Sequence, residues 1–77
     1  FQRDALPEAY RALQDDLAAD ITDETDGLRL EWPDRGQWLH VRPSGTEPVV
    51  RLIAEAPDAR SASALVDRAA AVLDGVA

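Results

Sequence analysis

The residues best suited to chemistry lie in one segment, residues 42–51, which reads Arg-Pro-Ser-Gly-Thr-Glu-Pro-Val-Val-Arg. An arginine guanidinium presents a planar fork of donors that matches phosphate oxygens and stays charged at any working pH. Ser44 and Thr46 add short hydroxyl donors, and Gly45 allows the backbone to approach an anion closely with its N–H groups. The segment therefore predicts a loop that binds phosphate.

Two prolines shape this loop. Pro43 and Pro48 push the residues before them, Arg42 and Glu47, toward extended backbone and stiffen both ends. A loop that is already shaped loses less entropy when it binds a ligand. Glu47 is a supporting candidate, because no paired carboxylate is evident for acid–base chemistry and its side chain could simply orient an arginine.

The segments on either side of the loop alternate as strands do, over residues 37–42 and 49–56. The expected core residues of these two strands are Leu39, Val41, Val50, Leu52 and Ala54. Arg42 and Arg51 then lie on the same non-core face of one hairpin, close to its turn. Strand parity therefore adds Arg51 to the predicted phosphate site.

His40 is on this same face and is a second supporting candidate. A register that pairs Arg42 with Val49 would set His40 opposite Arg51. A surface or packing role for the histidine remains the plainer interpretation, and a base in catalysis is the alternative.

The rest of the chain predicts the scaffold of an α+β fold. A helix is expected at 7–19, from the apolar stripe Leu6, Tyr10, Leu13 and Leu17. Residues 21–22 form a short extended piece, and 28–32 alternate strictly as a half-buried strand with Leu28, Leu30 and Trp32 inward. Asp58 is a plausible N-cap for a second helix, which Gly75 would end. This order predicts a small antiparallel sheet with two helices packed on one face.

Composition narrows the class of protein. The chain of 77 residues supports a single domain, and it has no cysteine that could form a disulfide. It also has no methionine and begins at Phe1, which suggests a fragment of a longer protein. Fifteen acidic residues against eight arginines give a net charge of −7, which opposes binding to nucleic acid. We expect no membrane span, no signal peptide, no metal site within the chain, and a cytoplasmic location.

Plainer interpretations exist for each feature. Ser-Gly-Thr between two strands is often only a turn, and a lone arginine on a strand is often a solvated charge or half of a salt bridge. Trp38 on the polar face either covers a sheet edge or belongs to an interface with absent domains.

The motif Arg-Pro-Ser-Gly-Thr-Glu-Pro followed by Val-Val-Arg-Leu-Ile-Ala-Glu resembles the phosphate-binding loop of the C-terminal domain of the α-D-phosphohexomutases. That superfamily includes phosphoglucosamine mutase, phosphomannomutase and phosphoglucomutase. The preceding Asp-Gly-Leu-Arg-Leu-Glu-Trp strand and the helix after Pro57 are also similar, so the resemblance covers roughly residues 20–75.

By resemblance, residues 1–77 are the fourth, C-terminal domain of a multidomain enzyme, with a fold like that of the TATA-binding protein. The loop would bind the substrate phosphate that is not being transferred, through Arg42, Ser44, Gly45, Thr46 and Arg51. A phosphoserine and a Mg²⁺ ion in other domains would carry the transfer, through a bisphosphorylated sugar that turns around. The fragment alone would then be catalytically silent, with a phosphosugar and the other domains as partners.

Gly45 in the motif favours phosphoglucosamine mutase, because loops of the phosphomannomutase type often carry Asn there. Two hypotheses of another class remain beside the mutase domain. One is a stand-alone anion- or nucleic-acid-binding module of similar fold, and the other is a structural or oligomer-forming domain. The acidic charge and the lack of an aromatic stacking series argue against nucleic acid.

Overall fold

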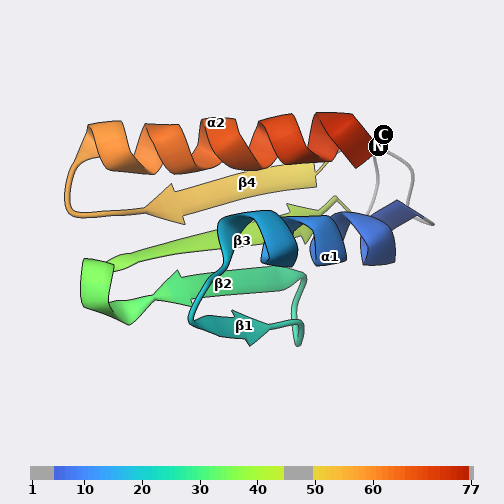
Figure 1. Ribbon diagram of the computed structural model, residues 1–77, viewed down its shortest axis with the longest axis horizontal. Coiled ribbons are helices and arrows are strands. Elements are labelled where there is room, and N and C mark those ends of the chain that lie inside the picture. Colours follow the sequence, from blue (N-terminus) through green and yellow to red (C-terminus); the bar gives the residue numbers. More distant parts are fainter. Residues whose placement is uncertain (1–4, 45–49, 77) are drawn as a thin grey trace.

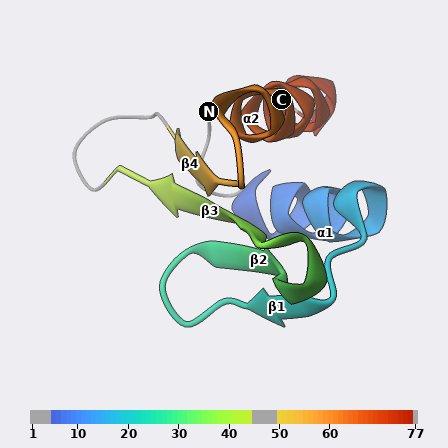
Figure 2. The ribbon, with the colours of Figure 1, turned by 90° about the vertical axis from the view of Figure 1, so that its left-hand side faces the viewer.

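The structure is a computed structural model that describes residues 5–44 and 50–76. In chain order its elements are α1 (Leu6–Leu17), β1 (Ile21–Asp23), β2 (Leu28–Trp32), β3 (Gln37–Pro43), β4 (Val50–Glu55) and α2 (Ala59–Val76). The four strands form one antiparallel sheet in the order β1-β2-β3-β4 (Figure 1). Both helices lie on one face of it (Figure 2), as predicted. The expected likeness to the TATA-binding protein is compatible with this arrangement and stays a prediction.

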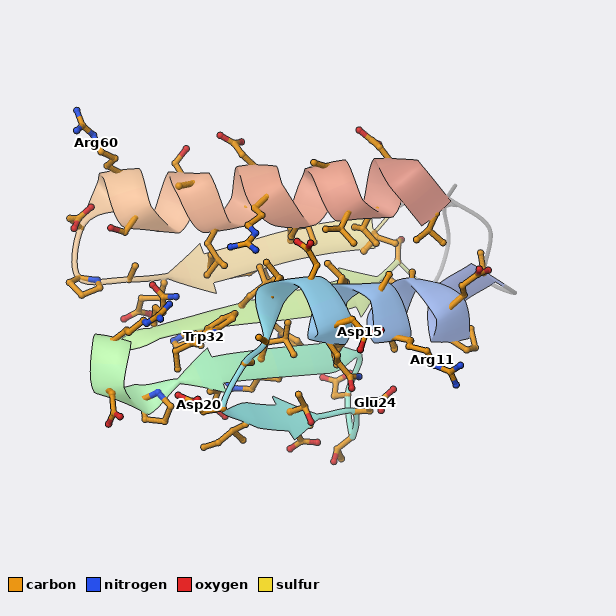
Figure 3. All side chains as sticks on the ribbon, viewed as in Figure 1. Arg11, Asp15, Asp20, Glu24, Trp32 and Arg60 are labelled. Atoms are coloured by element: carbon orange, nitrogen blue, oxygen red, sulfur yellow. The ribbon has the colours of Figure 1, made fainter. Side chains whose placement is uncertain are left out.

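The core lies between the sheet and the two helices. Its buried members from the strands are Leu28, Leu30, Trp32, Leu39 and Val41, all of them expected from alternation. The inward residues of β4 are only half-buried, because β4 is an edge strand that packs mainly against α2. Trp32 reaches toward α1 in Figure 3, whereas Arg11 and Asp15 project from the exposed side of that helix. One face of the sheet is therefore left uncovered by these helices.

Helix α1 ends two residues before the predicted position. Ala18 adopts a left-handed conformation, with φ of 50°, and its N–H bonds back to the carbonyl of Gln14 at 3.0 Å. The chain then turns so that the N–H of Asp20 bonds to the carbonyl of Glu31 at 3.1 Å and β1 can begin. Alanine pairs normally favour continuing a helix, so the pairing of β1 with β2 overrides local propensity here.

The apolar stripe of α1 is also displaced from the prediction. Ala9, Leu13 and Leu17 are buried, whereas Leu6 and Tyr10 are only partly covered. Small alanines at the buried positions of the helices allow close approach, and α1 contacts α2 directly.

The two helices are also joined by a polar contact. Arg68 of α2 lies 3.2 Å from the Asp16 carboxylate and donates from Nη2 to the Asp16 carbonyl at 2.9 Å. This contact satisfies a backbone carbonyl in the last turn of α1, which has no partner within the helix.

Helix α2 begins as predicted and ends later than predicted. The Ser61 N–H donates to Oδ1 of Asp58 at 2.7 Å, and the Asp58 carbonyl accepts the first helical bond from Ala62. Asp58 is therefore the N-cap. The prediction that Gly75 ends the helix is wrong, because α2 continues through it to Val76. No helix within the described residues is both long and apolar enough to cross a membrane.

The cap makes the stability of α2 depend on pH. Hydrogen bonds from Ser61 hold the pKa of Asp58 below its ordinary value. A carboxyl group whose pKa is lower in the folded than in the unfolded protein stabilises the fold at pH values above its unfolded-state pKa. That stabilisation is lost as the pH falls through the folded-state pKa. We expect Asp58→Ala to lower the Tm at pH 7 by about 5 °C.

Thermal melts of both proteins at pH 7 and at pH 2.5, roughly a unit and a half below the ordinary carboxyl pKa, would check this expectation. The difference should shrink on acidification, since the protonated cap is a poorer acceptor. A difference in Tm that stays constant across this range would contradict the assignment.

Candidate phosphate-binding site

The two arginines of the predicted site are direct neighbours across the hairpin. In the pairing of β3 with β4, Arg42 lies opposite Arg51 and Pro43 lies opposite Val50. Both arginines are exposed. The strand pairing therefore confirms the prediction that the two arginines share the non-core face of the hairpin. They lie directly opposite each other, which was not expected.

The register that would have set His40 opposite Arg51 is not the one observed. Arg42 does not pair with Val49, and His40 lies opposite Ile53, not Arg51. The two registers differ by two residues, which leaves every side chain on the same face. Burial patterns alone could not distinguish them for that reason.

Two like charges directly opposite each other on a sheet destabilise it. Arg42 has a nearby carboxylate, since its Nε lies 3.8 Å from Oδ1 of Asp26, and both side chains are more than half exposed, at 58% and 68%. An exposed pair of this length offsets little of the repulsion. A doubly charged anion placed between the guanidinium groups would offset much more.

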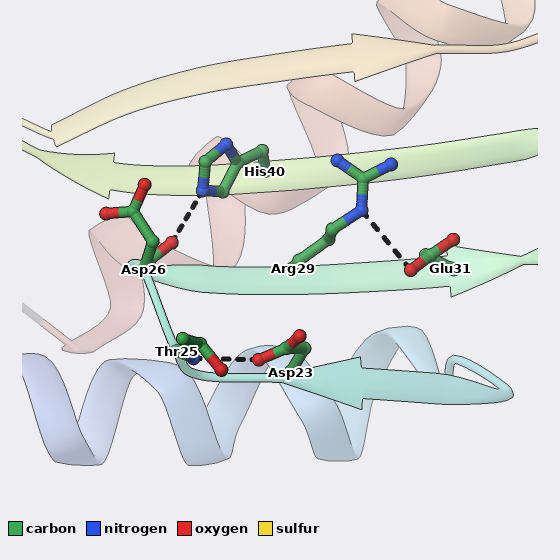
Figure 4. A network of polar contacts seen from close by, with 6 residues as sticks. All are labelled: Asp23, Thr25, Asp26, Arg29, Glu31 and His40. Carbon is green, nitrogen blue, oxygen red and sulfur yellow. Dashed lines mark hydrogen bonds and ion pairs between the residues drawn. The ribbon is translucent and has the colours of Figure 1, made fainter.

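Asp26 belongs to the connection between β1 and β2, residues 24–27, called the acidic turn below. Figure 4 shows the contacts that fix this turn. The Thr25 N–H donates to Oδ1 of Asp23 at 2.8 Å. Hydrogen bonds from the side chain of Thr25, and then from its N–H, hold the pKa of Asp23 below its ordinary value. Gly27 has φ of +69°, and a Cβ there would overlap the carbonyl oxygen of Val41. The acidic turn is therefore packed directly against β3.

His40 ties the acidic turn to β3. Its Nε2 lies 2.7 Å from the carbonyl oxygen of Asp26. A carbonyl can only accept, so Nε2 carries the proton and donates. In this state Nε2 is not available as a base. His40 holds the acidic turn against β3, and its supporting role at the phosphate site stays a prediction.

The acidic turn also influences helix α1. Burial raises the pKa of the Tyr10 hydroxyl, and the negative charges of Glu24 and Asp26 raise it further. The carboxylates of the acidic turn therefore lie close enough to α1 to affect Tyr10.

On the same uncovered face, further from the loop, Arg29 and Trp38 are occupied with each other. The Arg29 guanidinium lies 4.4 Å from the ring centroid of Trp38 and 3.2 Å from the Glu31 carboxylate. The indole face is thus covered by a cation, which leaves it poorly placed to stack on a base. This geometry weakens the nucleic-acid hypothesis, while the role of Trp38 in an interface stays a prediction.

The other predicted site residues are placed only in part. Ser44 follows β3 directly and is half-buried. Gly45, Thr46 and the supporting candidate Glu47 lie outside the described residues. Within the described part of the chain, no group of three or more His, Asp or Glu side chains could hold a metal ion. The described residues therefore do not fit a magnesium site.

The prediction missed Asp26, which was taken only as part of a polar turn. The signal was available, because an antiparallel partner of the strand that ends at Arg42 must begin beside it. The Asp-Gly pair immediately before β2 satisfies that condition.

The chain matches the family described as phosphoglucomutase/phosphomannomutase, C-terminal domain, over residues 2–72. The chain therefore belongs to this family. No solved structure matches it.

Named relatives agree with this assignment. A probable phosphoglucosamine mutase of Methanopyrus kandleri is 43% identical over 63 residues, which is 79% of this chain and 14% of the relative. A phosphoglucosamine mutase of Brevibacillus brevis is 40% identical over 84% of this chain and 11% of its own length. A phosphomannomutase of Sinorhizobium fredii is 45% identical over 69% of this chain and 11% of its own length. The chain thus spans about a seventh of these relatives or less.

Proposed function

We propose that this chain is the domain of a phosphohexomutase that binds the phosphate of the sugar. The enzyme would move a phosphoryl group within a hexose or hexosamine phosphate. The observation that carries the proposal is the direct opposition of Arg42 and Arg51 beside the family's loop motif. Such a pair is unfavourable when empty and well matched to a phosphate dianion.

In this proposal the chain's own residues bind and orient, and they break no bonds. Arg42 and Arg51 offer guanidinium forks, while Ser44, Gly45 and Thr46 supply hydroxyl and backbone donors. Holding one phosphate fixes the far end of the sugar and so positions its other end for transfer. The magnesium ion and the phosphoserine implied by the family resemblance would belong to other domains, and no step here depends on them.

Among substrates we favour a hexosamine phosphate over a hexose phosphate. Two of the relatives above are named as phosphoglucosamine mutases, and Gly45 fits that loop type. The partners would be the phosphosugar and the remaining domains of the same polypeptide, working in the cytoplasm. The covered indole of Trp38 and the net charge of −7 give nucleic acid no support as a partner.

The test is an assay of the full-length polypeptide with phosphates of glucosamine, mannose and glucose, followed by phosphorus NMR. We expect interconversion of the positional isomers of one of these sugar phosphates, with glucosamine phosphate preferred. Addition of that substrate should shift the side-chain Nε–H signals of Arg42 and Arg51. No interconversion of any of the three, or shifts confined to another part of the domain, would contradict the proposal.

A further inference from the structure

We propose that Asp26 is an exchangeable counter-ion of Arg42. It partly screens the charge of the arginine while the site is empty and competes with phosphate for it. This inference rests on the proposed function and concerns how the same site releases its ligand.

The first argument is that the position of Asp26 does not depend on its own side chain. Its carbonyl accepts from His40 at 2.7 Å, and the next residue, Gly27, would place a Cβ only 3.3 Å from the Cα of Arg42. These backbone contacts hold the acidic turn beside β3. The Asp26 carboxylate is therefore delivered to the arginine by the fold and not by the ion pair.

The second argument is the length of the pair. The distance of 3.8 Å from Nε of Arg42 to Oδ1 of Asp26 is longer than a hydrogen bond, and both groups face solvent. Such a pair is electrostatic, weak and easily separated. The pair also involves Nε, one of the guanidinium donors that a phosphate can bind, so Asp26 and phosphate compete for the same group.

The third argument is the repulsion between the two arginines. When an anion leaves the site, Arg42 and Arg51 again lie directly opposite each other, which is unfavourable on a sheet. Asp26 lies beside Arg42 in that empty state, so its charge lowers the cost of releasing the anion and therefore the affinity for phosphate.

The experiment compares Asp26→Asn with the wild type in the full-length enzyme, with inorganic phosphate as a competitive inhibitor. Asn keeps the backbone contacts and removes the charge. We expect the inhibition constant of phosphate to fall by about two- to fivefold, the range expected for an exposed charge pair. We expect kcat to fall as well, because a tighter site releases its phosphosugar more slowly.

Two controls isolate the mechanism. Asp34→Asn makes the same change of charge in the turn between β2 and β3, at the opposite end of these strands, and should leave the inhibition constant unchanged. In an Arg42→Ala background, Asp26→Asn should have no effect on phosphate inhibition, because the partner of Asp26 is gone.

An unchanged or higher inhibition constant in Asp26→Asn would overturn the inference. An equal effect of Asp34→Asn, or an effect that persists without Arg42, would also overturn it. The proposed function fails separately, and takes this inference with it, if Arg42→Ala alone leaves phosphate inhibition unchanged.

Discussion

Replacement of Arg42 by alanine in the full-length enzyme is expected to lower kcat/KM for the phosphosugar by roughly 10- to 150-fold. That range corresponds to the loss of one charge-assisted hydrogen-bonded contact, worth about 1.5–3 kcal/mol. The stability should hardly change, since the side chain is 58% exposed and its removal relieves repulsion with Arg51. Steady-state kinetics and a thermal melt of the same preparation measure the two effects.

Arg35→Ala is the matched control for this variant. Arg35 is an exposed arginine in the turn between β2 and β3, at the end of these strands remote from the loop, and its loss should leave kcat/KM unchanged. Arg42→Lys should recover only part of the activity, because an ammonium keeps the charge and loses the bidentate fork. Kinetics like those of the wild type in Arg42→Ala would refute the proposed function.

Replacement of Gly27 by alanine is expected to destabilise the fold strongly, although Gly27 lies outside the core. The new Cβ would overlap the carbonyl oxygen of Val41, which belongs to the backbone and cannot rotate away. The positive φ of +69° adds a conformational cost. Together these terms predict a loss of about 3 kcal/mol in the free energy of unfolding.

Gly36→Ala separates the cost of the steric overlap from the cost of the positive φ. Gly36 has a similar φ of +62°, but its nearest neighbour is a side-chain carbon of Pro57 at 3.8 Å. This control should cost only about 1 kcal/mol, the conformational part alone. Urea denaturation of the three proteins measures the difference. Equal losses in the two glycine variants would show that the turn can move away from β3, and that the placement of Asp26 is not fixed.

The strands of the scaffold could be predicted from the sequence, because apolar and polar residues alternate clearly along each strand that contributes to the core. The strand at 28–32 was predicted with its observed bounds, and its three inward residues are buried. The end of α1 was not predictable, since nothing in an Ala-Ala pair signals the left-handed turn that strand pairing imposes at Ala18. The end of α2 was predicted too early, at Gly75, because a glycine often follows the end of a helix but can also lie within its last turn.

The candidate site was predictable to the extent that it lies in one segment. Chain continuity brought Arg42 and Ser44 together, and strand parity added Arg51. Contacts between distant segments were harder to predict, because they require the order and register of the strands as well as the residue types. Asp26 lies sixteen positions before Arg42 in the chain and reaches it only through the pairing of β2 with β3.

The opposition of Arg42 and Arg51 also links folding to ligand binding. The hairpin that carries the loop is the part of the sheet whose formation its own charges oppose. An anion that bound between them would stabilise the native state, by an amount that grows with the logarithm of its concentration once this exceeds the dissociation constant. Exchange of the amide hydrogens between β3 and β4 should then slow as phosphate is added.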